Sequence, residues 1–186
     1  MAPLEISRPV ATIWTIGHST RSLEEFLGVL AAFQIETVAD VRRFPGSRRY
    51  PHFARDALAQ TLPAHGISYA WLAKLGGRRR VQPGSLNTGW RNASFRGYAD
   101  HLASSEFAQG LAELLVLAAL RRTTLMCSEV LWWRCHRSLI ADVLRQRGIE
   151  VIHIADALHS TVHPYTSPAR IVNGQLSYEA NVVFDS

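Results

Sequence analysis

Short apolar runs alternate with stretches of helical periodicity along the chain, and this alternation limits the fold more than any other feature. Apolar runs occupy residues 11–16, 36–41, 67–71, 123–127 and 150–154, and helical patterns cover 22–33, 54–65, 95–104, 106–120 and 136–147. Strands that alternate with helices form a largely parallel sheet covered on both faces. We therefore expect an α/β fold with a mainly parallel central sheet of about five strands. Asn173-Gly174 adds a small C-terminal hairpin.

The whole chain of 186 residues suits one domain, since it contains no repeat, low-complexity segment or interior linker. One stretch departs from the pattern. Between residues 72 and 93 the periodicity disappears, and Gly76-Gly77 and Pro83-Gly84 interrupt a run of arginines. Long irregular segments inside a compact domain are usually functional or disordered. We expect a flexible basic loop here.

The sequence favours a cytoplasmic protein. No apolar run approaches the roughly 18 residues that span a bilayer, and residues 1–12 lack a basic segment followed by an apolar one. Two cysteines in a chain of this length argue against a disulfide scaffold. We expect no membrane association.

The basic residues are almost all arginines. The chain has 20 basic and 15 acidic residues, a net charge of +5, and Lys74 is the one lysine. Planar guanidinium groups match phosphates better than ammonium groups do. A compositional bias of the source would give the same excess. The charge thus makes an anionic partner plausible and does not identify it.

Polar residues follow three of the expected strands. His18 follows the first strand, Asp40 and Arg42 lie at the end of the second, and Cys127 and Glu129 lie at the end of the fourth. Ligands of such sheets bind beyond the carboxyl ends of the strands. Asp40 needs a partner because it interrupts an apolar strand. Either it acts in catalysis, or it forms a closed internal pair with Arg42 or His18.

The helix expected at 136–147 begins with a basic first turn, Arg134-Cys135-His136-Arg137. A helix N-terminus already carries partial positive charge, so these residues are unfavourable there without a nearby anion. A bound phosphate or carboxylate would supply it. The carboxylate of Glu129, folded across the turn, is the internal alternative.

The two cysteines allow a second reading of the same segment. A helix N-terminus beside basic residues should lower the pKa of the Cys135 thiol, whereas Cys127 also fits the role of a small buried apolar residue. The spacing from Cys127 to Arg134 does not match a phosphate-cradling loop of the cysteine phosphatases. The chain has neither a C-x-x-C pair nor two histidines spaced four apart on a clear helix. We therefore expect no metal and no cofactor.

Aromatic residues accompany the arginines. Trp90, Tyr98 and Trp133 could stack on bases or cap the core. The run Arg78 to Arg80 could follow a phosphate backbone or form a solvated loop.

A series of short motifs carries a family resemblance. In chain order these motifs are Thr15-Ile16-Gly17-His18-Ser19-Thr20, Asp40-Val41-Arg42, Pro45 with Ser47-Arg48, Leu75-Gly76-Gly77, Asn87-Thr88-Gly89-Trp90-Arg91, Phe95 to Asp100, Met126-Cys127-Ser128-Glu129 and Cys135-His136-Arg137. The series resembles the DUF488 family over about residues 12–180. The resemblance implies a single α/β domain in the cytosol and supplies no reaction. A DNA-repair label on some members points weakly to nucleic acid.

Together these features predict an enzyme, of hydrolase type, that acts on a phosphate-containing substrate, nucleic acid or nucleotide. We expect Asp40 or Glu129 to act as general acid or base with His18 nearby. The expected substrate contacts are Arg42, Ser47, Arg48, Asn87, Trp90, Arg91, Tyr98, Trp133, Cys135, His136 and Arg137. The alternatives are a thiol enzyme with Cys127 or Cys135 as nucleophile and a non-catalytic nucleic-acid-binding protein.

Overall fold

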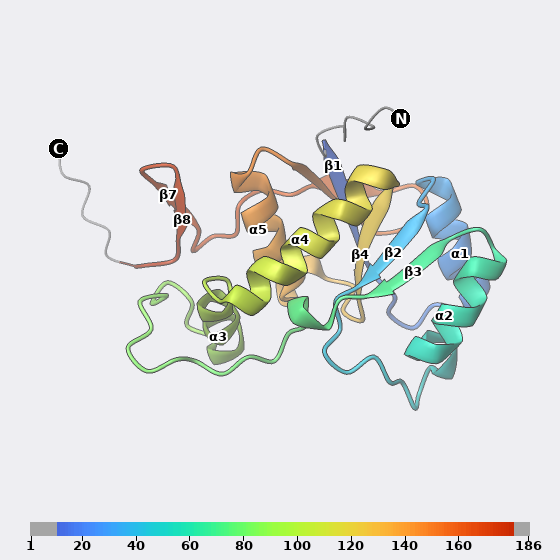
Figure 1. The fold of residues 1–186 in the computed structure, drawn as a ribbon, viewed down its shortest axis with the longest axis horizontal. Coiled ribbons are helices and arrows are strands. Elements are labelled where there is room, and N and C mark those ends of the chain that lie inside the picture. Colours follow the sequence, from blue (N-terminus) through green and yellow to red (C-terminus); the bar gives the residue numbers. More distant parts are fainter. Residues whose placement is uncertain (1–10, 181–186) are drawn as a thin grey trace, which may run out of the picture.

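Six strands form one sheet in the computed structural model, which describes residues 11–180 (Figure 1). The strands are β1 (Thr12–Gly17), β2 (Thr37–Asp40), β3 (Ser68–Trp71), β4 (Thr123–Cys127), β5 (Glu150–Ile154) and β6 (Ser160–Val162). Their order is β3-β2-β4-β1-β5-β6. All neighbours pair in parallel except β5 and β6. The expected α/β fold is confirmed.

The C-terminal hairpin is also confirmed. Strands β7 (Arg170–Val172) and β8 (Gln175–Ser177) pair in antiparallel fashion. Asn173 and Gly174 between them have φ of 51° and 76°, the left-handed pair that a tight hairpin turn requires. Strand β6 was not expected, because its three exposed residues give no periodicity.

The helices are α1 (Leu23–Ala32), α2 (Arg55–Ala64), α3 (Ala93–His101), α4 (Ser105–Leu120) and α5 (Arg137–Gln146), with short 3-10 turns η1 (Pro51–Phe53), η2 (Ala73–Leu75) and η3 (Trp132–Arg134). Local signals explain where they begin. Ser22 accepts a hydrogen bond from the Glu25 amide, and the Glu25 carboxylate accepts one from the Ser22 amide. This capping box starts α1.

The sheet separates two hydrophobic cores. Ile13 of β1 packs with Leu111 of α4 and Leu139 of α5, whereas Ile16 packs with Phe26 of α1 and Leu58 of α2. In Figure 1, α1 and α2 accordingly lie on one side of the sheet and α3, α4 and α5 on the other. Strands buried on both faces are typical of parallel sheets.

The connections switch from one face of the sheet to the other at β4, which lies between β2 and β1. It leaves β1 and β2 toward α1 and α2, but leaves β4 toward α5 on the opposite face. Loops that diverge from adjacent strands open a crevice at the carboxyl edge of the sheet. The ends of β1, β2 and β4 are therefore where a candidate ligand site is expected.

The segment 72–93 is irregular, as expected, but it is tied to α3. The Asp100 carboxylate accepts hydrogen bonds from the Gln82 amide, the Ser85 hydroxyl and the Asn87 side-chain amide. Arg79 forms an ion pair with Glu106 of α4. These contacts hold the loop against the helices, and its flexibility stays a prediction.

Among the described helices, none is both long enough and apolar enough to cross a membrane by itself. Only α3 and α4 taken together, with a bend of 77° between them, reach the necessary length and composition.

Candidate active site

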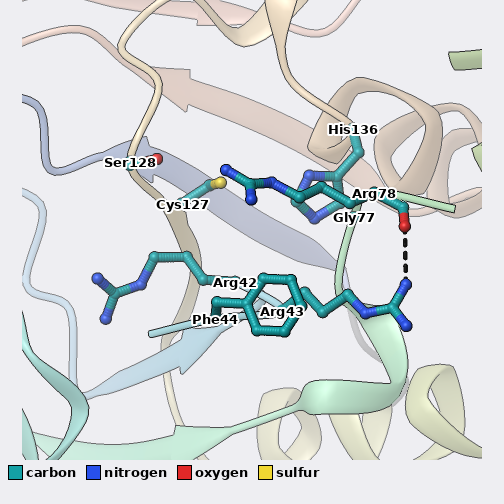
Figure 2. A pocket seen from close by; sticks show the side chains of 8 residues that line it. All are labelled: Arg42, Arg43, Phe44, Gly77, Arg78, Cys127, Ser128 and His136. Atoms are coloured by element: carbon teal, nitrogen blue, oxygen red, sulfur yellow. Dashed lines mark hydrogen bonds between the residues drawn. The ribbon is translucent and has the colours of Figure 1, made fainter. Parts of the chain in front are cut away.

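A cavity of about 140 Å³ opens at the carboxyl ends of β2 and β4 (Figure 2). It is lined by Arg42, Arg43, Phe44, Gly77, Arg78, Cys127, Ser128 and His136. A neighbouring cavity of about 460 Å³ shares Arg42, Arg78 and Ser128 and extends to His18, Ser47 and Glu129. A third, of about 330 Å³, shares Arg78, Cys127 and His136 and adds Cys135. The structure thus brings the polar strand-end residues together around Arg78.

Asp40 forms a closed ion pair behind these cavities. Its carboxylate accepts hydrogen bonds from Nε and a terminal nitrogen of Arg42, at 2.9 and 2.6 Å, and from the Tyr69 hydroxyl at 2.6 Å. It also accepts one from the Arg42 amide, and Asp40 is fully buried. With its oxygens so occupied, the carboxylate fits the internal-pair alternative and not the expected acid or base.

His18 is linked to this pair through Arg42. Its Nδ1–H donates to the Ser19 carbonyl at 2.9 Å, so Nε2 carries the lone pair and lies 3.3 Å from the Arg42 guanidinium. The ring stacks on Phe53, with centroids 4.2 Å apart. Burial is the main reason that the pKa of His18 falls below 6.5. His18 is therefore neutral at pH 7 and borders the larger cavity.

Arg137 does not form the anion seat that the sequence suggested. Its guanidinium is buried and donates to the carbonyls of Glu129 and Val130, at 2.6 and 2.9 Å. These bonds hold the turn after β4 across the end of β1. A Cβ at Gly17 would lie 1.9 Å from the Glu129 carbonyl, so only glycine fits beneath the turn. Arg137 is thus a positioning residue that binds two backbone carbonyls, while its buried Nε has no partner among residues 11–180.

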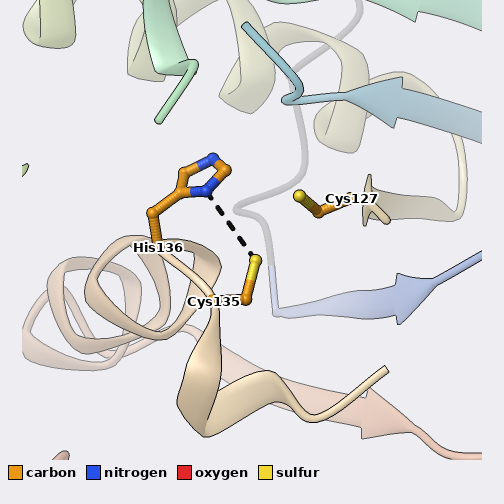
Figure 3. Close-up of side chains that lie close together, drawn as sticks. All are labelled: Cys127, Cys135 and His136. Atoms are coloured by element: carbon orange, nitrogen blue, oxygen red, sulfur yellow. Dashed lines mark hydrogen bonds between the residues drawn. The ribbon is translucent and has the colours of Figure 1, made fainter. Parts of the chain in front are cut away.

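Two thiols and an imidazole meet at the floor of the cavities (Figure 3). β4 ends at Cys127, and the turn through η3 brings the chain back to place Cys135 and His136 at the start of α5. Their sulfur and nitrogen atoms all lie within 4.8 Å of one another. His136 Nε2–H donates to the Val41 carbonyl at 2.9 Å, which leaves the Nδ1 lone pair directed to the thiols, 3.7 Å from Cys135 Sγ.

The two thiols have different pKa values. The hydrogen bond with Cys135 and the nearby His136 lower the pKa of Cys127 well below 9.0. The same bond with Cys127, together with burial, raises the pKa of Cys135 well above 9.0. Of the two thiols, Cys127 is therefore the one that loses its proton more readily.

Arg78 has the features of an anion-binding arginine, the role that the sequence suggested for Arg137. Its φ is 57°, a left-handed conformation unusual for arginine. The Arg43 guanidinium holds this backbone by donating to the Arg78 carbonyl at 2.7 Å. Figure 2 shows the Arg78 side chain extending toward Cys127. Across residues 11–180, no acceptor hydrogen-bonds to the Arg78 guanidinium.

Phe44 lies between two arginines at the mouth of the cavities. The guanidinium carbons of Arg43 and Arg78 are 5.6 and 5.7 Å from its ring centroid. Its side chain is 64% exposed. Sequence reasoning did not select Phe44 or Arg43, although Arg-Arg-Phe directly after a strand was a usable signal.

Several expected substrate contacts are structural instead. Tyr98 is fully buried and its hydroxyl donates to the Leu75 carbonyl. Asn87 is bound to Asp100. Trp90 packs between Phe95 and Tyr178. Tyr98 and Asn87 are thus engaged within the fold, which corrects their assignment as substrate contacts, whereas the buried indole nitrogen of Trp90 has no hydrogen-bond partner among residues 11–180.

The other expected contacts are accessible. Ser47 lines the 460 Å³ cavity and accepts a hydrogen bond from the Tyr50 amide. Trp133 is 53% exposed on η3. Arg48 and Arg91 are exposed but do not line any of the three adjoining cavities.

The family model described as "Domain of unknown function DUF488" matches residues 22–144. The chain belongs to this family. The match includes the Asp40–Arg42 pair and the thiol cluster of this DUF488 chain, but it is narrower than the 12–180 suggested by the motifs and does not reach His18. No curated protein and no solved structure matches the chain.

Proposed function

We propose that this DUF488 protein is an enzyme that acts on a phosphate-bearing substrate of the nucleotide class, bound in the cavities around Arg78. The observation that carries the proposal is the Arg78 side chain, which borders these three cavities and a fourth of about 710 Å³ and has no acceptor among residues 11–180. A left-handed backbone costs about 1–2 kcal/mol for a residue other than glycine. Such strain is concentrated at functional sites.

The surroundings of Arg78 suit a nucleotide. Arg43 and Arg78 supply positive charge and guanidinium donors for a phosphate. The exposed ring of Phe44 offers a stacking face for a base. The volume of the larger cavity, about 460 Å³, falls within the roughly 300–1,000 Å³ typical of small-molecule sites.

Candidate reacting groups surround the same space. Glu129 borders two of the cavities, and one of its oxygens accepts a hydrogen bond from the Leu131 amide, so the other is available as an acid or base. His18 is neutral and has its Nε2 lone pair beside Arg42. Asp40 orients Arg42 and, through it, His18. Cys127 and His136 form the floor.

Phosphate binding tests the role of Arg78. Titration of inorganic phosphate and adenosine monophosphate, followed by protein NMR or calorimetry, should show binding that Arg78→Ala weakens by about 10–100-fold, since hydrogen bonds to charged groups contribute about 1.5–3 kcal/mol. Arg121→Ala removes the same charge just before β4, at the opposite edge of the sheet, and should bind like the wild type. Equal binding by all three proteins would disprove the site.

Turnover tests the catalytic part of the proposal. Nucleoside phosphates and short oligonucleotides are incubated with the protein, and products are separated by anion-exchange chromatography. We expect conversion by the wild type and its loss in Glu129→Gln with binding retained. Tight, salt-dependent binding of oligonucleotides without conversion of any substrate would instead establish the non-catalytic binding protein.

We also propose a cytoplasmic setting. Cys127 and Cys135 are both free thiols although their sulfurs are close neighbours. Oxidising compartments convert such pairs to disulfides, whereas the cytosol keeps them reduced.

A further inference from the structure

We infer that Cys127, Cys135 and His136 bind a metal ion of the zinc class at the floor of the cavities. The binding of the ion stands on these three residues, whereas its use in a reaction rests on the proposed function. The donors are two sulfurs and one nitrogen, a set that favours zinc and similar ions over calcium or magnesium.

The geometry of the donors is close to that of a metal site. With Zn–S of about 2.3 Å and Zn–N of about 2.0–2.1 Å, a tetrahedral ion places its ligand atoms about 3.5–3.8 Å apart. The three donor atoms lie within 4.8 Å of one another, and Cys135 Sγ is 3.7 Å from His136 Nδ1. All three side chains point toward one another (Figure 3). Metal binding therefore needs side-chain adjustments of about 1 Å.

The imidazole is held in the tautomer that a metal requires. His136 donates its Nε2–H to the Val41 carbonyl, and this leaves Nδ1 unprotonated and facing the thiols. A ligating histidine almost always has such a backbone or carboxylate partner on its other nitrogen. Gly77 packs directly against the ring, where a Cβ would lie 2.8 Å from Nδ1. The site is thus supported from two sides.

The basic surroundings do not exclude a cation. Two deprotonated thiols neutralise a divalent ion, so the filled site adds no net charge. Arg42 is paired with Asp40, and Arg137 is engaged with two backbone carbonyls. A neutral metal centre beside Arg78 leaves the attraction for an anionic substrate intact.

The cluster resembles a catalytic metal site more than a structural one. Structural zinc has four protein ligands, whereas catalytic zinc keeps one position for water or substrate. Among the His, Cys, Asp and Glu residues within 11–180, only three donors gather here. The cavities of about 140 and 330 Å³ both border Cys127 and His136. The fourth position therefore faces the proposed substrate space.

Cobalt(II) provides a test with a spectroscopic readout. The full-length protein is treated with a chelator, kept reduced with a phosphine and titrated with cobalt. We expect one equivalent to produce the visible bands of tetrahedral cobalt and a thiolate-to-metal charge-transfer band, both lost when zinc is added. Cys127→Ser, Cys135→Ser and His136→Gln should each abolish or strongly weaken the bands, while His65→Gln, at an exposed histidine, should leave them unchanged.

Gly77→Ala tests the site with all three ligands in place. The added methyl group should displace the His136 ring and weaken cobalt binding by about 10–100-fold, as loss of a supporting contact does in metal sites. Circular dichroism confirms that each variant is folded. Absence of the bands in the folded wild type, or their persistence in both cysteine variants, would overturn the proposal. Rapid alkylation of Cys127 in that case would favour the thiol enzyme.

The failure of this inference can be distinguished from failure of the proposed function. Arg78→Ala should weaken phosphate binding and leave the cobalt bands unchanged. Phosphate binding without cobalt bands would overturn only the metal site, and cobalt bands without phosphate binding would overturn only the anion site.

Discussion

At the scale of single residues, the site depends on which charges are satisfied inside the fold. Asp40→Asn should destabilise the protein by about 3–5 kcal/mol, because it leaves the buried Arg42 without its counter-charge. Urea unfolding followed by fluorescence measures this change. Asp56→Asn breaks an exposed pair with Arg55 and should change stability by less than about 1 kcal/mol. Equal effects of the two variants would show that the Asp40–Arg42 pair is not a closed internal pair.

Sequence reasoning identified the edge of the site better than the role of each residue. His18, Asp40, Cys127 and Glu129 were placed together because parallel strands end at one edge. The sequence could not show that Arg137 binds backbone carbonyls and leaves the proposed anion site to Arg78. That arrangement depends on how residues 128–134 fold back over Gly17. That turn has no periodicity. The proximity of Cys127, Cys135 and His136 could not be seen for the same reason, because the turn brings together thiols that are eight positions apart.

At the scale of elements, one carboxylate of α3 contributes much of what holds the loop between η2 and α3. Asp100 lies on α3 and accepts three hydrogen bonds from residues 82–87. Asp100→Ala should release this segment, because these bonds then have no acceptor. Limited trypsin digestion should cut more rapidly at Arg80 and Arg91 in the variant, with Asp56→Ala as the control. Unchanged cleavage would mean that other contacts hold the loop.

Most element boundaries were predicted to within a few residues, since periodicity, the Ser22 cap and the glycines after helices are local signals. Strand β6 was not, because it forms only by pairing with the exposed side of β5. The anchoring of the 72–93 loop also escaped prediction, as its partners are on helices that follow it in the chain.

At the scale of the whole molecule, a buried chain of hydrogen bonds connects the sheet, α5 and the C-terminal region. His163 Nε2 donates to the Asp142 carboxylate at 2.8 Å, His163 Nδ1 is hydrogen-bonded to His153 Nε2 at 2.8 Å, and His153 Nδ1 is hydrogen-bonded to the Thr15 hydroxyl at 2.6 Å. Trp132 stacks on His153, with centroids 4.3 Å apart. The chain thus links the turn that carries Cys135 to β1, β5 and α5.

This chain predicts a dependence of stability on pH. Burial, followed by the charges of His163 and Arg137, lowers the pKa of His153 from 6.5 to about 2. Below pH 6.5 the unfolded chain takes up a proton at His153 that the folded protein excludes. The contribution of neutral His153 to the free energy of unfolding is therefore complete above pH 6.5. It is lost as the pH falls toward 2, at up to about 1.4 kcal/mol per pH unit.

Urea unfolding of the wild type and of His153→Gln at a series of pH values between 7.5 and 5 tests this linkage, because the substitution removes the titrating group. The variant should show a slope smaller by about 1.4 kcal/mol per pH unit below pH 6, whatever it loses in stability at pH 7.5. Thr15→Val disturbs the same chain without removing an ionisable group, and should retain the wild-type slope. If His153→Gln also retains that slope, His153 takes up its proton in the folded protein as readily as in the unfolded chain, and the linkage fails.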